Sequence, residues 1–107
     1  NIIIFDDSIV RGITMKTLVS QLKKQGVKEI HIRIAAPKIR YTCEYGIDMS
    51  NKSNLLVNKF SCDEDIVEFL GCNSLKYLDL DKFKNAMDNF GNMCTGCFNG
   101  NYKELEW

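Results

Sequence analysis

The first third of the chain changes its hydrophobic pattern twice. Residues 2–5 are continuously apolar and β-prone and are followed by two aspartates, which predicts a buried strand in the centre of a parallel sheet. From residue 15 to residue 22 apolar side chains recur at helical spacing, and Gly26 follows as a stop signal. Isoleucines alternate with polar residues between 27 and 36, which predicts a second strand. The order strand, loop, helix, strand predicts a βαβ unit with a right-handed crossover.

The middle of the chain is less regular. Residues 37–48 show no period and predict a loop, whereas residues 53–60 predict a short helix. Ser61 and Glu64 have the spacing of a capping box. They therefore predict the start of a helix that runs to Leu70, where a glycine follows.

The last third mixes short elements with irregular sequence. Residues 75–78 predict a short strand, residues 79–87 predict a helix, and the Asn, Gly and Cys content from Asn89 onward predicts an irregular lobe. We expect the fold class to be α/β, with a parallel sheet. In this view residues 1–36 form the βαβ unit and residues 37–107 form a helical, cysteine-bearing part of the same domain, without an intervening linker.

Composition excludes several classes of function. Fourteen Lys and Arg balance fourteen Asp and Glu, and no basic block is present, so we expect no nucleic-acid partner. No apolar run has the length of a membrane span, and no signal peptide opens the chain. The five cysteines are odd in number, which favours reduced thiols in the cytoplasm over a disulfide framework. The chain begins with Asn1 directly ahead of an apolar strand, so we expect a fragment of a longer protein.

The segment after the first strand carries the strongest chemical signal. Asp6 and Asp7 follow the strand at its carboxyl end, where parallel sheets bind ligands. The loop then leads into a helix N-terminus, which attracts phosphate through free N–H groups and a partial positive charge. Gly12 lets the backbone approach an anion closely, and Ser8 and Thr14 offer hydroxyl donors.

The acidic pair and the loop predict different parts of one ligand. Carboxylates repel phosphate, so the natural partners of Asp6 and Asp7 are sugar hydroxyls or a Mg²⁺ ion. A phosphorylated ribose meets both requirements. The alternative interpretation is that Asp7 and Ser8 only cap the following helix, as such residues often do.

The pattern of residues 2–14, Ile-Ile-Ile-Phe-Asp-Asp-Ser-Ile-Val-Arg-Gly-Ile-Thr, resembles the fingerprint of the type I phosphoribosyltransferases. The Asp-Asp-Ser-Ile-Val-Arg-Gly form is the version found in the glutamine phosphoribosylpyrophosphate amidotransferase family. Residues 33–48, 71–80 and 94–102 resemble later segments of that family, in the same order. The resemblance therefore covers nearly the whole chain and implies part of a type I phosphoribosyltransferase fold.

The resemblance assigns roles to this loop. Asp6 and Asp7 would bind the ribose hydroxyls of phosphoribosyl pyrophosphate (PRPP) and its Mg²⁺ ion. The 5-phosphate would be bound by the residues that follow, which are Ser8, Ile9, Val10, Arg11, Gly12, Ile13 and Thr14. Ile13 stands where the family usually has Thr, so one hydroxyl donor is lost and we expect a weaker phosphate contact.

Three cysteines form a candidate metal centre. Cys94 and Cys97 have a spacing that suits half of a zinc site, a redox pair or half of a cluster site, and Gly96 eases the turn between them. These residue types alone leave zinc and iron–sulfur about equal. In one branch of the amidotransferase family, cysteines at the places of Cys43, Cys94 and Cys97 bind a 4Fe–4S cluster, whose fourth ligand would lie upstream of Asn1. Cys62 and Cys72 do not match ligand positions.

The activity that the resemblance implies is pentosyl transfer. Ammonia derived from glutamine would displace pyrophosphate from PRPP to give 5-phosphoribosylamine, the first committed step of purine biosynthesis. The ammonia would come from an N-terminal glutaminase domain that this chain lacks, and we expect the full-length protein to form homo-oligomers. The chain therefore holds part of a transferase site, and we expect it to be inactive alone.

Three other interpretations remain open. A different type I phosphoribosyltransferase would share residues 2–14 but lack the three cysteines. A PRPP-binding regulator would carry the same loop without catalysis, together with a nucleic-acid-binding region. A small free-standing metal module would need a complete set of ligands, and the chain offers only three plausible cysteines.

Overall fold

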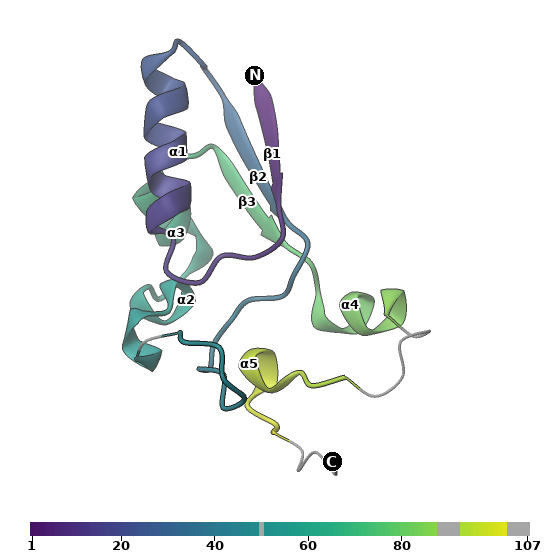
Figure 1. The fold of residues 1–107 in the computed structure, drawn as a ribbon. Coiled ribbons are helices and arrows are strands. Elements are labelled where there is room, and N and C mark those ends of the chain that lie inside the picture. The colour runs from purple at the N-terminus through teal and green to yellow at the C-terminus, as the bar shows by residue number, and fades with distance from the viewer. Residues whose placement is uncertain (50, 88–92, 103–107) are drawn as a thin grey trace.

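The computed structural model describes residues 1–49, 51–87 and 93–102. The elements follow the chain in this order (Figure 1): β1 Ile2–Asp6, α1 Ile13–Lys24, β2 Ile30–Ile34, the 3-10 helix η1 Lys52–Asn54, α2 Leu56–Lys59, α3 Asp63–Leu70, β3 Ser74–Tyr77, α4 Leu80–Ala86 and α5 Gly96–Asn99. The predicted α/β class and the βαβ unit at the N-terminal end are confirmed.

The described strands form one parallel sheet in the order β1-β2-β3. Ile4 of β1 pairs with Ile32 of β2, and Ile32 pairs with Leu75 of β3. Because side chains alternate along a strand, these three residues all point to the same face of the sheet. That face is the inner one, since Ile32 is fully buried and Leu75 is nearly so.

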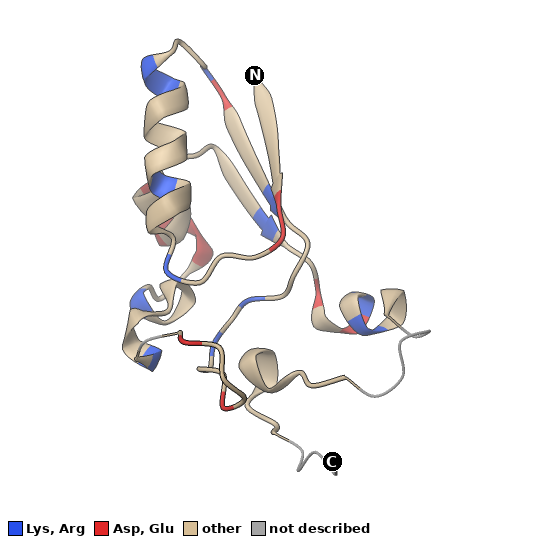
Figure 2. Cartoon of the chain, viewed as in Figure 1, with Lys and Arg blue, Asp and Glu red and all other residues tan. Residues whose placement is uncertain are grey.

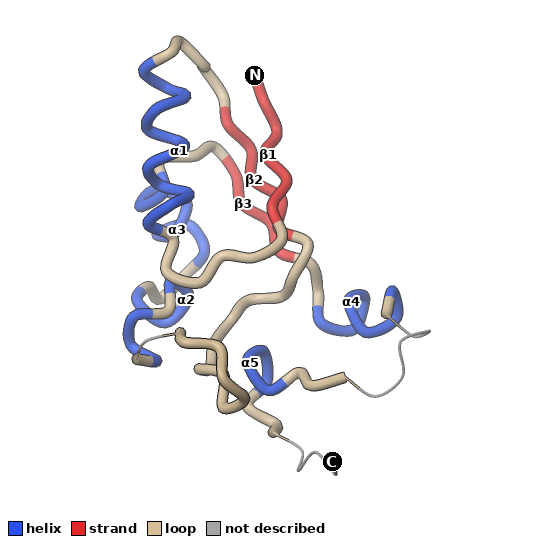
Figure 3. Tube along the Cα trace, in the orientation of Figure 1, coloured by secondary structure: helices blue, strands red, loops and turns tan. Residues whose placement is uncertain are grey.

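Helices α1 and α3 pack beside each other and cover the inner face (Figure 3). Met15 and Val19 of α1 are buried against this face, as are Ile66 and Leu70 of α3. The apolar side of each helix therefore packs toward the strands, as the periodicity predicts. This arrangement fixes the end of β1 and the start of α1 as the two anchors of the loop between them.

The predicted central position of β1 is wrong for this chain. Among the described strands, β1 pairs with β2 alone and lies at an edge, while β2 lies in the centre. The alternate residues Ile3 and Phe5 point to the outer face and are 58% and 78% exposed. A two-faced apolar strand is typical of a central position, but within this sequence no strand pairs with the other side of β1 in the described residues.

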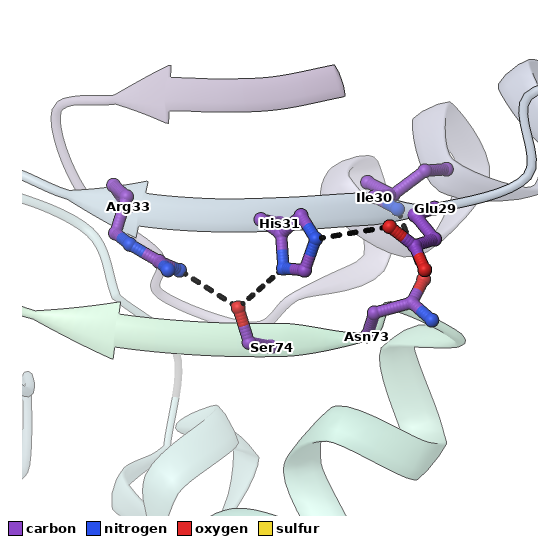
Figure 4. Close-up of polar contacts among 6 residues, drawn as sticks. All are labelled: Glu29, Ile30, His31, Arg33, Asn73 and Ser74. Atoms are coloured by element: carbon purple, nitrogen blue, oxygen red, sulfur yellow. Dashed lines mark hydrogen bonds and ion pairs between the residues drawn. The ribbon is translucent and has the colours of Figure 1, made fainter. Parts of the chain in front are cut away.

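The outer face of β2 and β3 carries a polar network (Figure 4). The Nδ1 atom of His31 lies 2.8 Å from Oγ of Ser74, and Arg33 donates from Nη1 to the same oxygen at 2.9 Å. The Nε2 atom of His31 lies 3.8 Å from a carboxylate oxygen of Glu29. At the edge of the network, the side-chain oxygen of Asn73 accepts from the backbone amide of Ile30 at 2.9 Å. These contacts tie the two strands together and give His31 a structural role.

Two predicted element boundaries are wrong. The second strand covers Ile30–Ile34 rather than 27–36, because only these five residues pair with a neighbouring strand. The capping box is absent, since the N-cap of α3 is Cys62 and makes no side-chain hydrogen bond to the helix. Asp63, Glu64 and Asp65 instead occupy the first turn, where carboxylates interact favourably with the helix dipole.

The helix predicted at 53–60 is interrupted. Leu55 has an extended backbone, with φ −66° and ψ 130°, and separates η1 from the single turn of α2. Leu55 and Leu56 are fully buried, so packing rather than helix propensity determines the conformation here. The helix predicted at 79–87 is α4, which begins one residue later because Asp79 is its N-cap and accepts from Asp81 N at 3.0 Å.

The C-terminal lobe lies beyond the carboxyl ends of the strands (Figure 1). The segment predicted to be irregular from Asn89 onward contains one helical turn, α5, and its residues 89–92 and 103–107 lie outside the described part of the chain. No helix in the described residues is long and apolar enough to cross a membrane.

Candidate functional site

Residues 6–14 lie where the sequence places them, between the carboxyl end of β1 and the first turn of α1. Figure 2 shows acidic residues at the end of β1 and a basic residue ahead of α1. The backbone carbonyl of Asp6 accepts from Ala35 N at 2.9 Å, which holds the end of β1 against the segment that follows β2. The loop therefore starts from a fixed point in the sheet.

The acidic pair is exposed and ordered by local hydrogen bonds. Asp6 accepts from the backbone amide of Asp7 at 2.9 Å, and Asp7 accepts from the hydroxyl of Ser8 at 3.1 Å. Ser8 is half-buried, whereas both carboxylates face solvent. These bonds run within the loop and not to the N–H groups of α1, so the alternative in which Asp7 and Ser8 cap the helix is wrong. The carboxylates are free to meet a sugar hydroxyl or a cation.

The loop of residues 8–14 is anchored by its apolar members. Ile9 is buried in the core, and Gly12 is buried as well. Gly12 has φ +80°, a left-handed conformation that glycine adopts without steric cost. An added Cβ there would lie 2.9 Å from Cδ2 of Leu56, so the loop packs directly on α2.

The polar members of the 8–14 loop remain accessible. Arg11, Ile13 and Thr14 are exposed, and Ile13 is 57% exposed. Gly12 is the N-cap of α1, and the first turn of α1 contains no acidic residue. The N–H groups of that turn lack intrahelical partners, as in any helix. The arrangement can thus accept an anion at the helix start, with Arg11 and Thr14 nearby in sequence.

The fold brings the cysteine-bearing segments side by side. The carbonyl of Cys97 accepts from Arg40 N at 2.9 Å and from Tyr41 N at 3.0 Å. Cys43 follows two residues later and accepts from Tyr45 N at 3.4 Å through its sulfur. The sulfur of Cys94 likewise accepts from Gly96 N at 3.5 Å. Each of these two sulfur atoms is therefore held in place by a backbone amide of its own segment.

An aromatic residue closes this cluster of segments. The hydroxyl of Tyr102 donates to the carbonyl of Thr42, next to Cys43. A Cβ added at Gly96 would overlap the ring of Tyr102, so only glycine fits at position 96. Tyr102 also packs against Tyr45, with ring centroids 5.8 Å apart. The sequence predicts that Gly96 eases the turn between the two cysteines. The structure gives a second reason for glycine, which is that a side chain there would collide with Tyr102.

The pKa of Cys97 depends on its surroundings. Burial raises the pKa of Cys97, and the nearby Cys43 and Cys94 raise it further through charge repulsion. Cys43 and Cys94 therefore both influence Cys97, although 50 residues lie between Cys43 and Cys94 in the sequence. Within the described residues, no group of three or more His, Cys, Asp or Glu is arranged to hold a single metal ion.

The remaining two cysteines lie in other parts of the fold. Cys72 is buried in the hydrophobic core, and burial is the main cause that raises its pKa. Cys62 is exposed at the start of α3. All five cysteines are free thiols, so no disulfide framework is present.

Two residues near the site have no signal in the sequence. Leu56 contacts Gly12 and donates its backbone amide to Val10 O at 2.8 Å. Asn58 donates from its side chain to the carbonyls of Arg40 at 2.8 Å and Lys52 at 3.0 Å. Both lie on α2, far in sequence from the 8–14 loop, which Leu56 contacts. Only knowledge of the tertiary packing identifies them.

Comparison with known proteins gives consistent results. Chloroplastic amidophosphoribosyltransferase from Glycine max is 44% identical over 102 residues, which cover 94% of this chain and 18% of that protein. Amidophosphoribosyltransferase from Mus musculus is 38% identical over 136 aligned positions, which cover 99% of this chain and 26% of the relative. The chain thus spans 18% and 26% of the length of these two relatives. No family model matches.

Solved structures agree with the sequence comparison. The glutamine PRPP amidotransferase of B. subtilis, complexed with ADP and GMP, matches 94% of this chain with a TM-score of 0.80 and 32% identity. A structure described as the allosteric regulatory enzyme of purine biosynthesis matches with a TM-score of 0.81 and 31% identity. The matches cover 23% and 22% of those chains, so the similarity concerns one segment of each.

Proposed function

Because the chain is homologous over nearly its whole length to one segment of the amidophosphoribosyltransferases, we propose that it is the PRPP-binding part of such an enzyme. The observation that carries the proposal is the 6–14 segment. There an exposed acidic pair, a left-handed Gly12 and a helix start follow one another at the carboxyl end of a parallel strand.

The acidic pair and the 8–14 loop bind different groups of PRPP. Asp6 and Asp7 accept hydrogen bonds from the ribose hydroxyls, and they are the candidate ligands of a Mg²⁺ ion. A bound Mg²⁺ ion would offset the charge of the pyrophosphate. The 5-phosphate lies at the start of α1, bound by the loop of residues 8–14. Ile9 and Val10 contribute through their backbone, since Ile9 is buried and Val10 is half-buried.

The reaction of the full-length protein is displacement at the ribose C1 atom. Ammonia released from glutamine forms the new C–N bond, the C–O bond to pyrophosphate breaks, and pyrophosphate leaves with its electron pair. The residues of this chain contribute position and charge, because holding the sugar in place removes much of the entropic barrier. Ile13 offers only its backbone N–H, so the phosphate is held with one donor fewer than in relatives that carry Thr.

Cys43, Cys94 and Cys97 are the proposed ligands of a 4Fe–4S cluster. Three thiols on adjoining segments, two of them accepting backbone amides, fit a cluster that is bound through thiolates. The resemblance to the iron–sulfur branch of the amidotransferase family favours a cluster over a zinc ion, because the residue types alone suit both. The fourth ligand would come from outside this chain. Such a cluster would supply structural cross-linking of the C-terminal lobe.

The setting of the protein completes the proposal. Five free thiols fit a reducing compartment, and we assign the protein to the cytoplasm, while the Glycine max relative is chloroplastic. The glutaminase domain and the rest of the transferase domain would lie outside these residues, and the active form would be a homo-oligomer. Residues 1–36 and 37–107 would belong to one phosphoribosyltransferase domain.

The test is glutamine-dependent release of pyrophosphate from PRPP by the full-length protein. Asp7→Asn keeps the shape of the side chain but removes its charge, and we expect a loss on the order of 100-fold. Asp81→Asn changes an exposed carboxylate of α4 and should act like the wild type. Binding of PRPP without pyrophosphate release would instead indicate a regulator, and transfer to a nucleobase would indicate another phosphoribosyltransferase.

The metal is tested separately by iron, sulfide and zinc content. We expect iron and sulfide in the wild type, their loss in Cys97→Ser, and their retention in Cys62→Ser, whose thiol lies outside the proposed set. Zinc in place of iron would contradict the cluster.

A further inference from the structure

We propose that the short helix α2 holds the 8–14 loop in its phosphate-binding conformation, with Leu56 and Asn58 as positioning residues. This inference rests on the proposed function of that loop. Figure 1 shows α2 beneath the N-terminal end of α1, where the loop passes between them. Leu56 acts on the loop directly, and Asn58 ties α2 to the segments on which it rests.

Leu56 sets the direction of a peptide group inside the loop. Its backbone amide donates to Val10 O at 2.8 Å. The carbonyl and the following N–H of a trans peptide point in opposite directions, and the chain has no cis peptide among its described residues. The N–H of Arg11 is therefore directed away from α2, where it is available to an anion. The Leu56 side chain also fills the space that a side chain at Gly12 would need.

A single helical turn needs external support to do this. Helices as short as α2 are unstable by themselves, because nucleation costs more than one turn of hydrogen bonds returns. Asn58 supplies support by using its side-chain amide as a double donor, to Arg40 O at 2.8 Å and to Lys52 O at 3.0 Å. It thereby links α2 to the segment before the first cysteine and to η1.

The segment that receives Asn58 is itself fixed. Arg40 and Tyr41 donate their backbone amides to Cys97 O, at 2.9 Å and 3.0 Å. Lys52, the other acceptor of Asn58, places its ammonium group 4.4 Å from the ring centroid of Tyr41. The 8–14 loop is thus connected through α2 to the backbone of the cysteine-bearing lobe. Each link is a direct contact between neighbouring groups rather than a long-range effect.

The competing explanation is that burial alone holds α2. Leu55, Leu56 and Val57 are all buried, whereas Asn58 is exposed. If burial suffices, removing the amide of Asn58 leaves the affinity for PRPP unchanged. If Asn58 positions α2, removing its amide lowers the affinity for PRPP and leaves KM for glutamine unchanged.

The experiment compares variants of the full-length protein. Asn58→Asp retains the size of the side chain but turns a carboxylate toward two carbonyl oxygens, and Asn58→Gln retains the amide. The matched control is Asn54→Asp in η1, where an exposed Asn makes no side-chain hydrogen bond within the described residues. The readouts are KM for PRPP, KM for glutamine, kcat and the melting temperature.

We expect Asn58→Asp to raise KM for PRPP about tenfold, the effect of losing donors and gaining a repulsive charge. KM for glutamine should stay constant, Asn58→Gln should recover part of the loss, and Asn54→Asp should match the wild type. An unchanged KM for PRPP in Asn58→Asp would overturn the inference, as would equal changes in both KM values with a lower melting temperature. A wild-type protein that binds no PRPP would refute the proposed function, and this inference would fall with it.

Discussion

Gly12 lies so close to Leu56 that a Cβ on the glycine would meet Cδ2 of the leucine at 2.9 Å. The same glycine has φ +80°, so two independent constraints favour glycine at this position. Together they determine how the 8–14 loop enters α1.

Replacing Gly12 with Ala should therefore impair ligand binding. We expect the Kd for ribose 5-phosphate, measured by calorimetry on the full-length protein, to rise at least about tenfold. The matched control is Gly26→Ala, since Gly26 has φ +90° but no atom within 4 Å of an added Cβ. Strain from the positive φ costs about 1–3 kcal/mol in both variants. Equal effects of the two variants on binding would show that contact with Leu56 is unimportant.

Replacing Gly96 with Ala should loosen the cysteine-bearing lobe. The added methyl group would overlap the ring of Tyr102, displace it and break its hydrogen bond to Thr42 O. We expect Cys97, which is half-buried, to react faster with iodoacetamide, as measured by mass spectrometry of its peptide. In a double-mutant cycle, Tyr102→Ala should remove most of the additional effect of Gly96→Ala. Strictly additive effects would exclude the clash as the cause.

Replacing Ser74 with Ala should weaken the pairing of β2 with β3. The hydroxyl of Ser74 lies 2.8 Å from His31 Nδ1 and accepts from Arg33 at 2.9 Å, so its loss removes one contact from each of these two side chains. We expect a local cost of about 1–2 kcal/mol. Hydrogen exchange in peptides spanning 30–34 and 74–77 should become faster, while Ser20→Ala on the exposed side of α1 should have no effect there. Binding of ribose 5-phosphate should stay unchanged, since the network faces away from α1.

Tyr77 should make the stability depend on alkaline pH. Its hydroxyl is buried without a hydrogen-bond partner in the described residues, and burial raises its pKa to about 12. An unfolded tyrosine has a pKa of about 10. The neutral hydroxyl is thus favoured in the folded state, so its contribution to stability is full below about pH 10 and is lost as the pH rises through about 12.

Tyr77→Phe tests this directly. The variant should be as stable as the wild type at pH 7, or more stable by up to about 1 kcal/mol, because it removes an unsatisfied buried hydroxyl. It should also lose part of the decline in melting temperature between about pH 10 and 12. Tyr41→Phe is the control variant, because Tyr41 is half-buried beside Lys52. We expect it to leave the decline in melting temperature as large as in the wild type. A lower stability of Tyr77→Phe at pH 7 would reveal a partner for the hydroxyl.

The sequence was informative where local pattern determines structure. The period of α1, the isoleucines of β2 and the position of Gly26 are properties of neighbouring residues, and the βαβ unit follows from them. The acidic pair and Gly12 were placed correctly for the same reason, since a loop between a strand and a helix starts and ends at fixed points.

Features that depend on distant residues could not be predicted. The edge position of β1 depends on which strands are available to pair with it, and the same apolar run would suit a central strand. Leu56 reaches Gly12 only because the chain returns beneath α1. The hydrophobic periodicity of the sequence does not predict that path of the chain. The prediction of a capping box was wrong although Ser61 and Glu64 have the required spacing. Three carboxylates in the first turn of α3 stabilise the start of the helix through its dipole instead.

The exposed side chains of Ile3 and Phe5 also affect how strongly the isolated polypeptide would associate with itself in solution. They form an apolar strip along a strand whose outer edge has free backbone donors and acceptors in the described part of the sheet. Two such strips can adhere to each other, so the turbidity of a solution of the isolated segment should grow with its concentration. Successful handling would then depend on dilution, or on co-expression with a polypeptide that shields this strip.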